Sequence, residues 1–132
     1  MSWVQDNLPL VIALAILGWM IWGRVIKPKM LGIKKMTAGA YPDFNEAHTL
    51  VDVRSTGEWR GGHPSNAIHI PLNEIEQKVD KIPLDKPVVL ICAAGMRSAM
   101  AASIVAKAGH TDVYNFAGGM GSWCAAQLPM SK

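Results

Sequence analysis

The sequence predicts an α/β fold, a parallel β-sheet flanked by helices, preceded by one N-terminal transmembrane helix. The sheet is predicted by short apolar runs that alternate with helix-type segments between residues 50 and 127. The transmembrane helix is predicted by residues 8–23, which form an apolar stretch without a charged side chain. A chain of 132 residues has room for one globular domain after that stretch.

The N-terminal apolar stretch approaches the length of a membrane span when its flanks are included. At ~1.5 Å per residue, a helix over residues 4–26 comes near the ~30 Å of hydrocarbon in a bilayer. Trp3, Trp19 and Trp22 stand where interfacial aromatic residues are common. A cleavable signal peptide is disfavoured because the first basic residue, Arg24, follows the apolar run.

Charge is distributed unevenly along the chain. Residues 1–36 hold five basic and one acidic side chain, a balance of +4, and residues 37–132 hold eight basic and nine acidic ones, a balance of −1. The basic character therefore belongs to the flank of the apolar stretch and gives no reason to expect nucleic-acid binding. The positive-inside rule predicts a single-pass protein, of the bacterial inner-membrane kind, with its C-terminal domain in the cytoplasm. The predicted organisation is a transmembrane helix at 1–26, a basic linker at 27–36 and a domain at 37–132.

The predicted strands and helices follow one another in the order expected of a parallel sheet. Strands are predicted at residues 50–53, 67–70, 88–91 and 113–116, where β-branched or aliphatic residues gather. Helical segments are predicted at 58–61, 73–79, 98–107 and 121–127. Asn73 is suited to cap the second of these, and Gly109 and Pro129 to end the last two. Strand-helix alternation of this kind places helices on both faces of the sheet.

Cys92 stands at the carboxyl end of the apolar run 88–91, before a loop of small residues and a helix predicted to begin at Ser98. Ligands of parallel α/β sheets bind beyond the carboxyl ends of the strands. A thiolate at this place faces loop amides, the positive end of a helix and the guanidinium of Arg97, all of which favour charged sulfur. We therefore predict that Cys92 is a low-pKa nucleophile, although many free cysteines are only packing residues.

The length of the loop bears on what it holds. Only four residues, from Ala93 to Met96, separate Cys92 from Arg97. A phosphate-binding cysteine loop of the phosphatase type needs five residues there to wrap a tetrahedral oxyanion while the arginine pairs with it. The smaller ring of amides is better suited to a terminal sulfur carried on Cys92 as a persulfide.

On these residues the chain resembles the rhodanese-like sulfurtransferases, and the resemblance continues from residue 50 onward. The family's other signature stretches occur in order as Leu50-Val51-Asp52-Val53-Arg54, Glu58-Trp59, Gly62-His63, Ala67-Ile68-His69-Ile70-Pro71-Leu72 and Phe116-Ala117-Gly118-Gly119-Met120-Gly121-Ser122-Trp123. Two stretches depart from the family pattern. Asn66 replaces the usual glycine of a turn, which asparagine can still form in a left-handed conformation, and residues 38–44 replace a regular first helix.

The resemblance implies a sulfurtransferase that uses ping-pong chemistry. Cys92 would take sulfur from a donor such as thiosulfate and pass it from a persulfide to cyanide or to a thiol acceptor. The substrate-binding residues would be Ala93, Ala94, Gly95, Met96, Arg97 and Ser98. Arg97 would attract the anionic donor, and Met96 and Ala94 would make the mouth small and apolar. Asp52 and Arg54 would support the loop, with Arg54 pairing to Glu58 as the alternative. No cofactor is implied, and a protein sulfur acceptor or membrane partner stays open.

The remaining chemistry-bearing residues predict no second centre. His48, His63, His69 and His110 lack the spacing of a metal site, so no metal is expected. Gly118-Gly119 is typical of a tight turn that lets the last helix pack. Cys124 is interpreted as a core residue, with a resolving thiol as the alternative. Two other function classes remain open, namely a cysteine phosphatase or arsenate reductase and a non-catalytic, membrane-tethered interaction module.

Overall fold

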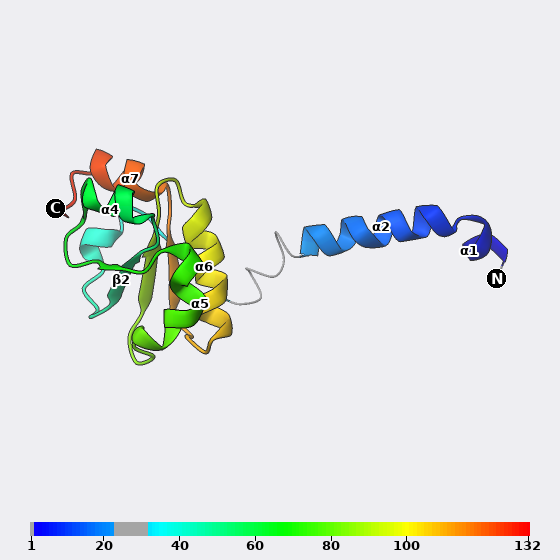
Figure 1. Ribbon diagram of the computed structural model, residues 1–132, viewed down its shortest axis with the longest axis horizontal. Helices are drawn as coiled ribbons and strands as arrows, with labels where there is room; N and C mark the ends of the chain where they lie inside the picture. The colour runs from blue at the N-terminus through cyan, green and yellow to red at the C-terminus, as the bar shows by residue number, and fades with distance from the viewer. Residues whose placement is uncertain (1, 23–31) are drawn as a thin grey trace. The chain divides into compact units, whose positions relative to one another are not determined.

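The computed structural model describes residues 2–22 and 32–132, and the chain divides into two compact units, residues 1–31 and 32–132 (Figure 1). The first unit contains helices α1 (Ser2–Asp6) and α2 (Leu8–Ile21). A turn at Asn7 separates them, and the Asn7 side-chain amide donates a hydrogen bond to the Trp3 carbonyl at 2.8 Å. Pro9 stands in the first turn of α2, where its missing N–H costs nothing.

The predicted transmembrane helix is wrong. Across residues 2–22 and 32–132, no helix is both long enough and apolar enough to cross a membrane. Helix α2 has 14 residues, which at ~1.5 Å per residue give about 21 Å against ~30 Å of hydrocarbon. The prediction joined residues across the Asn7 turn and extended to residues 25 and 26, which lie outside the described residues. The single-pass membrane localisation, which rested on this helix, is wrong as well.

The second unit is built on a five-stranded, fully parallel sheet with the strand order β1-β6-β5-β2-β4. Its strands are β1 (Lys34–Met36), β2 (Thr49–Asp52), β4 (Ile68–His69), β5 (Val88–Ile91) and β6 (Val113–Phe116). A small antiparallel pair joins β3 (His63–Pro64) to β7 (Met130–Ser131). The predicted parallel sheet flanked by helices is therefore confirmed.

Helices cover both faces of the sheet. They are α4 (Thr56–Arg60), α5 (Ile75–Lys78), α6 (Met96–Lys107) and α7 (Gly119–Ala125), with short 3₁₀ turns η2 (Tyr41–Asp43), η3 (Leu72–Glu74) and η4 (Val79–Lys81). Helices α5 and α6 lie side by side (Figure 1). The central strand β5 is buried on both faces, with Val88 and Leu90 in one apolar cluster and Val89 and Ile91 in the other. This two-sided burial explains its uninterrupted apolar sequence.

Several element boundaries differ from the predicted ones. Lys34–Met36, which fall in the predicted linker 27–36, form the edge strand β1 beside β6. Helix α6 begins at Met96 rather than Ser98, with Gly95 as its N-terminal cap in a left-handed conformation at φ 103°. The predicted helix 73–79 is broken into η3, α5 and η4, and Asn73 makes no capping hydrogen bond. The short turn η2 stands where a regular first helix is absent, as the sequence indicates.

The turn at Asn66 is formed as the sequence predicts. Asn66 has a φ of 67°, which is the left-handed conformation that glycine adopts most easily and asparagine tolerates. The Ala67 N–H donates to the Pro64 carbonyl at 3.2 Å across this turn. The chain can therefore reverse between β3 and β4 without the glycine that the family usually places here.

Candidate functional site

The Cys92 loop connects the carboxyl end of β5 to the first turn of α6. The Cys92 side chain is buried, with 1% of its surface exposed. Its Sγ accepts a hydrogen bond from the Gly95 backbone N–H at 3.0 Å and lies 3.3 Å from the Ser98 hydroxyl oxygen. Gly95 can aim its N–H at the sulfur because it adopts a positive φ, which is costly for residues with a Cβ. The structure therefore places the sulfur and these two partners within one loop.

The surroundings of Cys92 lower the pKa of its thiol. Burial acts in the opposite direction and raises the pKa, because a charged sulfur loses water there. Hydrogen bonds from the Ser98 hydroxyl and from the backbone N–H groups of Ser98, Gly95 and Ala94 outweigh that effect. These donors face the sulfur before any substrate binds, so the thiolate is the favoured nucleophile.

Ser98 links the sulfur to a buried polar network beneath the loop. The fully buried Ser98 hydroxyl lies 2.6 Å from Asn115 Oδ1 and can turn its one proton to that oxygen or to the Cys92 sulfur, and Asn115 Nδ2 donates to the Gly95 carbonyl at 3.2 Å. Asn115 on β6 thus holds both the serine that faces the sulfur and the glycine that caps α6. No sequence pattern identified Asn115, because it is 23 positions from Cys92 in the chain (115 − 92) and meets the loop only through strand pairing.

Removal of the Ser98 hydroxyl should weaken the thiolate. In a Cys124→Ser background, which leaves one reactive thiol, we expect Ser98→Ala to shift iodoacetamide alkylation of Cys92 to higher pH. Only the thiolate reacts, so loss of a donor worth ~1 kcal/mol should slow alkylation about 5-fold at neutral pH. Intact-protein mass spectrometry over a pH series measures this, with Ser103→Ala on the same helix as the control. Equal profiles for the two variants would contradict the role of Ser98.

The start of α7 holds the loop from the other side. Met120 N–H donates to the Cys92 carbonyl at 2.8 Å, and Gly121 N–H donates to the Ala93 carbonyl at 3.5 Å. With their carbonyls bound to α7, these peptide units keep a fixed orientation. Gly119 permits this close approach, since a Cβ built on it would overlap the Cys92 carbonyl oxygen. The predicted tight turn at Gly118-Gly119 is thus present, with φ values of 75° and 56°.

Asp52 and Arg54, the predicted supporting residues, form a buried ion pair at the end of β2. Arg54 Nη2 lies 2.8 Å from Asp52 Oδ2, and Arg54 Nε is 3.0 Å from both carboxylate oxygens. Arg54 also donates to the Gly62 carbonyl at 2.7 Å. The alternative that Arg54 pairs with Glu58 is wrong. Arg54 instead ties β2 to the chain that follows α4.

Glu58 pairs with Arg97 of the Cys92 loop. Arg97 Nη1 lies 2.7 Å from Glu58 Oε1 and Nη2 lies 3.0 Å from Oε2, a bidentate contact between α4 and the first turn of α6. Both side chains are about one-third exposed, at 35% and 36%. The hydrogen bonds from Arg97 lower the pKa of Glu58 to about 2, so the carboxylate is charged at neutral pH. The sequence analysis did not place Glu58 in the candidate site and did not predict its ion pair with Arg97.

The rest of the loop faces outward. Met96 is 79% exposed, and Met100, one turn further along α6, is 59% exposed. Ala94 is exposed and Ala93 is half-buried. The exposed side chains around the outer part of the loop are therefore small at Ala94 and flexible and apolar at Met96.

Histidines and the second cysteine lie outside this arrangement. His63 and His69 stack on Trp59, with ring centroids 3.5 Å and 4.7 Å apart. Within the described part of the chain, no three His, Cys, Asp or Glu side chains are grouped to hold a metal ion. Cys124 is exposed rather than part of the core, because its neighbour Trp123 turns inward and is 1% exposed. The interpretation of Cys124 as a core residue is therefore wrong.

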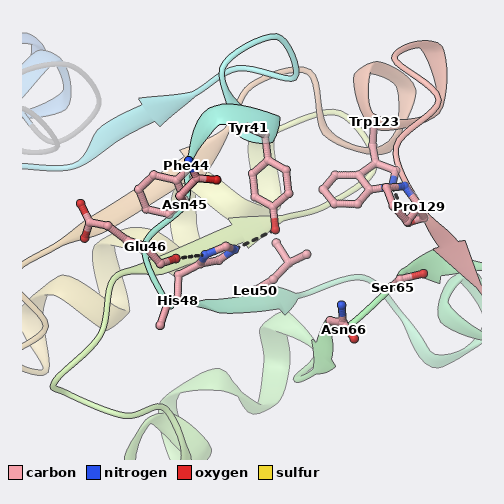
Figure 2. Close-up of a pocket in the computed structure, with 11 residues that line it drawn as sticks. Tyr41, Phe44, Asn45, Glu46, His48, Leu50, Ser65, Asn66, Trp123 and Pro129 are labelled. Carbon is pink, nitrogen blue, oxygen red and sulfur yellow. Dashed lines mark hydrogen bonds between the residues drawn. The ribbon is translucent and has the colours of Figure 1, made fainter.

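One cavity of the second unit lies away from Cys92. It has a volume of about 410 Å³ and is bordered by Tyr41, Phe44, His48, Leu50 and Trp123, among others. Figure 2 shows the Tyr41 hydroxyl bonded to His48 Nε2 and His48 Nδ1 bonded to the Glu46 carbonyl, each at 2.8 Å. None of its lining residues belongs to the Cys92 loop. This cavity is therefore separate from the Cys92 loop.

Comparisons with known proteins agree on one family. The model of the rhodanese-like domain matches residues 38–126. The uncharacterized protein YqhL of Bacillus subtilis is 35% identical over 120 residues, which cover 91% of this chain and 94% of that protein. Thiosulfate sulfurtransferase GlpE of Vibrio cholerae is 32% identical over 76% of this chain and 93% of its own length. A rhodanese-related protein from Thermoplasma volcanium superposes with a TM-score of 0.67 at 32% identity, covering 74% of this chain and 97% of its own.

Proposed function

Because the chain belongs to the rhodanese-like domain family, we propose that it is a sulfurtransferase that carries sulfur on Cys92 as a persulfide. The observation that carries this proposal is the hydrogen bond of 3.0 Å from the Gly95 N–H to Cys92 Sγ, reinforced by Ser98. A sulfur atom that already accepts hydrogen bonds in the resting protein is prepared to hold negative charge. The curated relatives named as thiosulfate sulfurtransferases support thiosulfate as a donor.

The first half-reaction loads the cysteine. The Cys92 thiolate attacks the outer sulfur of thiosulfate, a new S–S bond forms, the bond to the sulfonate sulfur breaks, and sulfite leaves with the electron pair of that bond. The product is a Cys92 persulfide anion. The backbone N–H groups of Ala94, Gly95 and Ser98, which lower the pKa of the thiol, would stabilise charge on this sulfur together with the other amides of residues 93–98.

The second half-reaction unloads it. A nucleophile, either cyanide or a thiolate, attacks the outer persulfide sulfur, and Cys92 leaves as the thiolate that the loop stabilises. The acceptor is a small thiol or a protein thiol. In this scheme Met96 and Ala94 border the approach, and Asp52 and Arg54 keep the end of β2 fixed beside the loop.

A mass measurement tests the proposal. The protein is incubated with thiosulfate, freed of excess reagent, and analysed by intact-mass and peptide mass spectrometry. We expect one added sulfur atom on the peptide that contains Cys92, and its removal by cyanide with formation of thiocyanate. Hydrolysis of p-nitrophenyl phosphate without any sulfur adduct would overturn the proposal in favour of a cysteine phosphatase.

A further inference from the structure

The ion pair between Glu58 and Arg97 changes the charge that a substrate meets at the loop mouth. Arg97 is the one cationic residue within the loop segment 92–98. Both of its terminal nitrogens contact Glu58, at 2.7 Å and 3.0 Å. Both terminal N–H groups of the guanidinium are therefore engaged by the Glu58 carboxylate, and the ion pair has no net charge.

Glu58 is held in this position from its own side of the contact. It is the third residue of α4, and its Oε1 accepts hydrogen bonds from the Ser55 N–H at 3.1 Å and the Ser55 hydroxyl at 3.0 Å. The Ser55 hydroxyl in turn accepts from the Glu58 N–H at 3.3 Å, which completes a capping box. The capping box thus holds the Glu58 carboxylate in place independently of Arg97, which distinguishes this ion pair from one between two mobile surface side chains.

Arg97 remains within electrostatic range of the reactive sulfur. Its hydrogen bonds to Glu58 raise its pKa most, and the charges of Glu58, Cys92 and Asp52 raise it further. An unpaired guanidinium at this place would attract a doubly charged donor toward Cys92. The negative charge of Glu58 largely cancels that attraction, so a second negative charge on the donor adds little to the electrostatic energy of its binding.

We propose that Glu58 sets the donor class of this protein, disfavouring the thiosulfate dianion and favouring organic persulfides, whose sulfur carries at most one negative charge. This inference rests on the proposed sulfurtransferase function and narrows it. The loading step for a persulfide is balanced without a further reactant. The Cys92 thiolate attacks the outer sulfur of R–S–SH, a new S–S bond forms, the S–S bond of the donor breaks, R–S⁻ leaves with its electron pair, and the proton stays on the new Cys92 persulfide.

The test compares two donors on the full-length chain. The probes are thiosulfate and 2-hydroxyethyl persulfide, whose organic part is uncharged, and the readout is the rate of Cys92 persulfide formation by rapid-quench mass spectrometry. For the unmodified protein we expect a higher kcat/KM with the persulfide. Glu58→Gln keeps a side chain that can complete the capping box but removes the charge. It should raise kcat/KM for thiosulfate about 10-fold and that for the persulfide less than about 3-fold, since the Coulomb energy scales with donor charge.

Salt dependence and two further variants separate this effect from a structural one. The gain with Glu58→Gln should shrink as ionic strength rises, because an exposed charge is screened. It should vanish in the double variant Glu58→Gln/Arg97→Gln, which lacks the guanidinium. Glu46→Gln changes an exposed glutamate before β2, which borders the cavity that includes no residue of the Cys92 loop; it removes the same charge and should alter neither donor preference nor salt dependence.

The possible outcomes distinguish the inference from its premise. An unchanged ratio of the two donors in Glu58→Gln, with persulfide still formed on Cys92, overturns the role of Glu58 and leaves the sulfurtransferase proposal intact. A preference for thiosulfate in the unmodified protein overturns it equally. If neither thiosulfate nor the organic persulfide forms a persulfide on Cys92, the sulfurtransferase proposal itself is overturned.

Discussion

Cys92→Ser is expected to reduce sulfur transfer from thiosulfate to cyanide to the uncatalysed rate. A serine hydroxyl in the same loop is not ionised at neutral pH and cannot form the proposed persulfide, so both half-reactions are lost. The buried volume changes little, and the variant should keep its fold. Thiocyanate formation measures activity, and circular dichroism with urea unfolding verifies the fold.

Cys124→Ser is the matched control for that experiment. Cys124 is exposed on α7, and none of the hydrogen bonds to the reactive sulfur involves it. We expect this variant to retain most of its activity. Comparable losses in both variants would contradict a single reactive cysteine and indicate a relay between two thiols.

Gly119→Ala is expected to lower the free energy of unfolding by roughly 2–5 kcal/mol, from the strain of a left-handed alanine and from overpacking. Gly119 has a φ of 56°, and an added Cβ would stand 2.6 Å from the Ala93 carbonyl carbon and oxygen and would overlap the Cys92 carbonyl oxygen. These atoms are backbone and cannot turn aside. Relief of the clash must move the loop from α7, so the activity per folded molecule should fall as well.

Gly121→Ala tests whether that effect is specific to position 119. A Cβ on Gly121 meets no atom within 4 Å, and Gly121 lies in α7 without a positive φ. Its replacement should leave stability unchanged or raise it by up to ~1 kcal/mol, as is usual for glycine to alanine in a helix. Urea unfolding of both variants gives the comparison. Similar stability for the two would show that the loop tolerates a Cβ at position 119.

Strands β5 and β6 could be predicted because buried strands consist mainly of apolar residues. Residues 88–91 and 113–116 form β5 and β6 with the predicted bounds, since β5 is covered on both faces and must be apolar throughout. Strand β1 was missed because Lys34 and Lys35 are exposed at the edge of the sheet. An edge strand needs only backbone pairing, here with β6, and its side chains need not be apolar.

The hydrogen-bond partners of Cys92 could be predicted from local sequence, whereas the ion pair between Arg97 and Glu58 could not. Sulfur, glycine and serine fall within seven consecutive residues, so their contacts follow from one loop. The partner of Arg97 is 39 positions away and depends on how α4 packs against α6. One signal was available, since Ser55 and Glu58 have the spacing of a capping box, which fixes where a carboxylate can point.

The N-terminal prediction failed for a different reason. A uniformly apolar stretch satisfies the requirements of a bilayer span by composition, and its length was supplied by including residues on either side. The structure ends α2 at Ile21 and interrupts the helix before Leu8. Hydropathy measures how well a segment tolerates hydrocarbon, and it does not report where the helical hydrogen bonds stop.

Under the proposed persulfide chemistry, the burial of the Cys92 sulfur would make the loaded and the empty protein differ in how far the terminal sulfur reaches. An unloaded sulfur is almost fully covered, with the side chain 1% exposed. A persulfide would place a second sulfur about 2 Å beyond the first, at the end of one S–S bond. An acceptor that is too large to reach the buried thiolate could then react only with the protein that carries the persulfide, because the outer sulfur lies closer to the surface. The acceptor would then distinguish persulfidated from unmodified Cys92 by the position of the terminal sulfur, and no conformational change would be required.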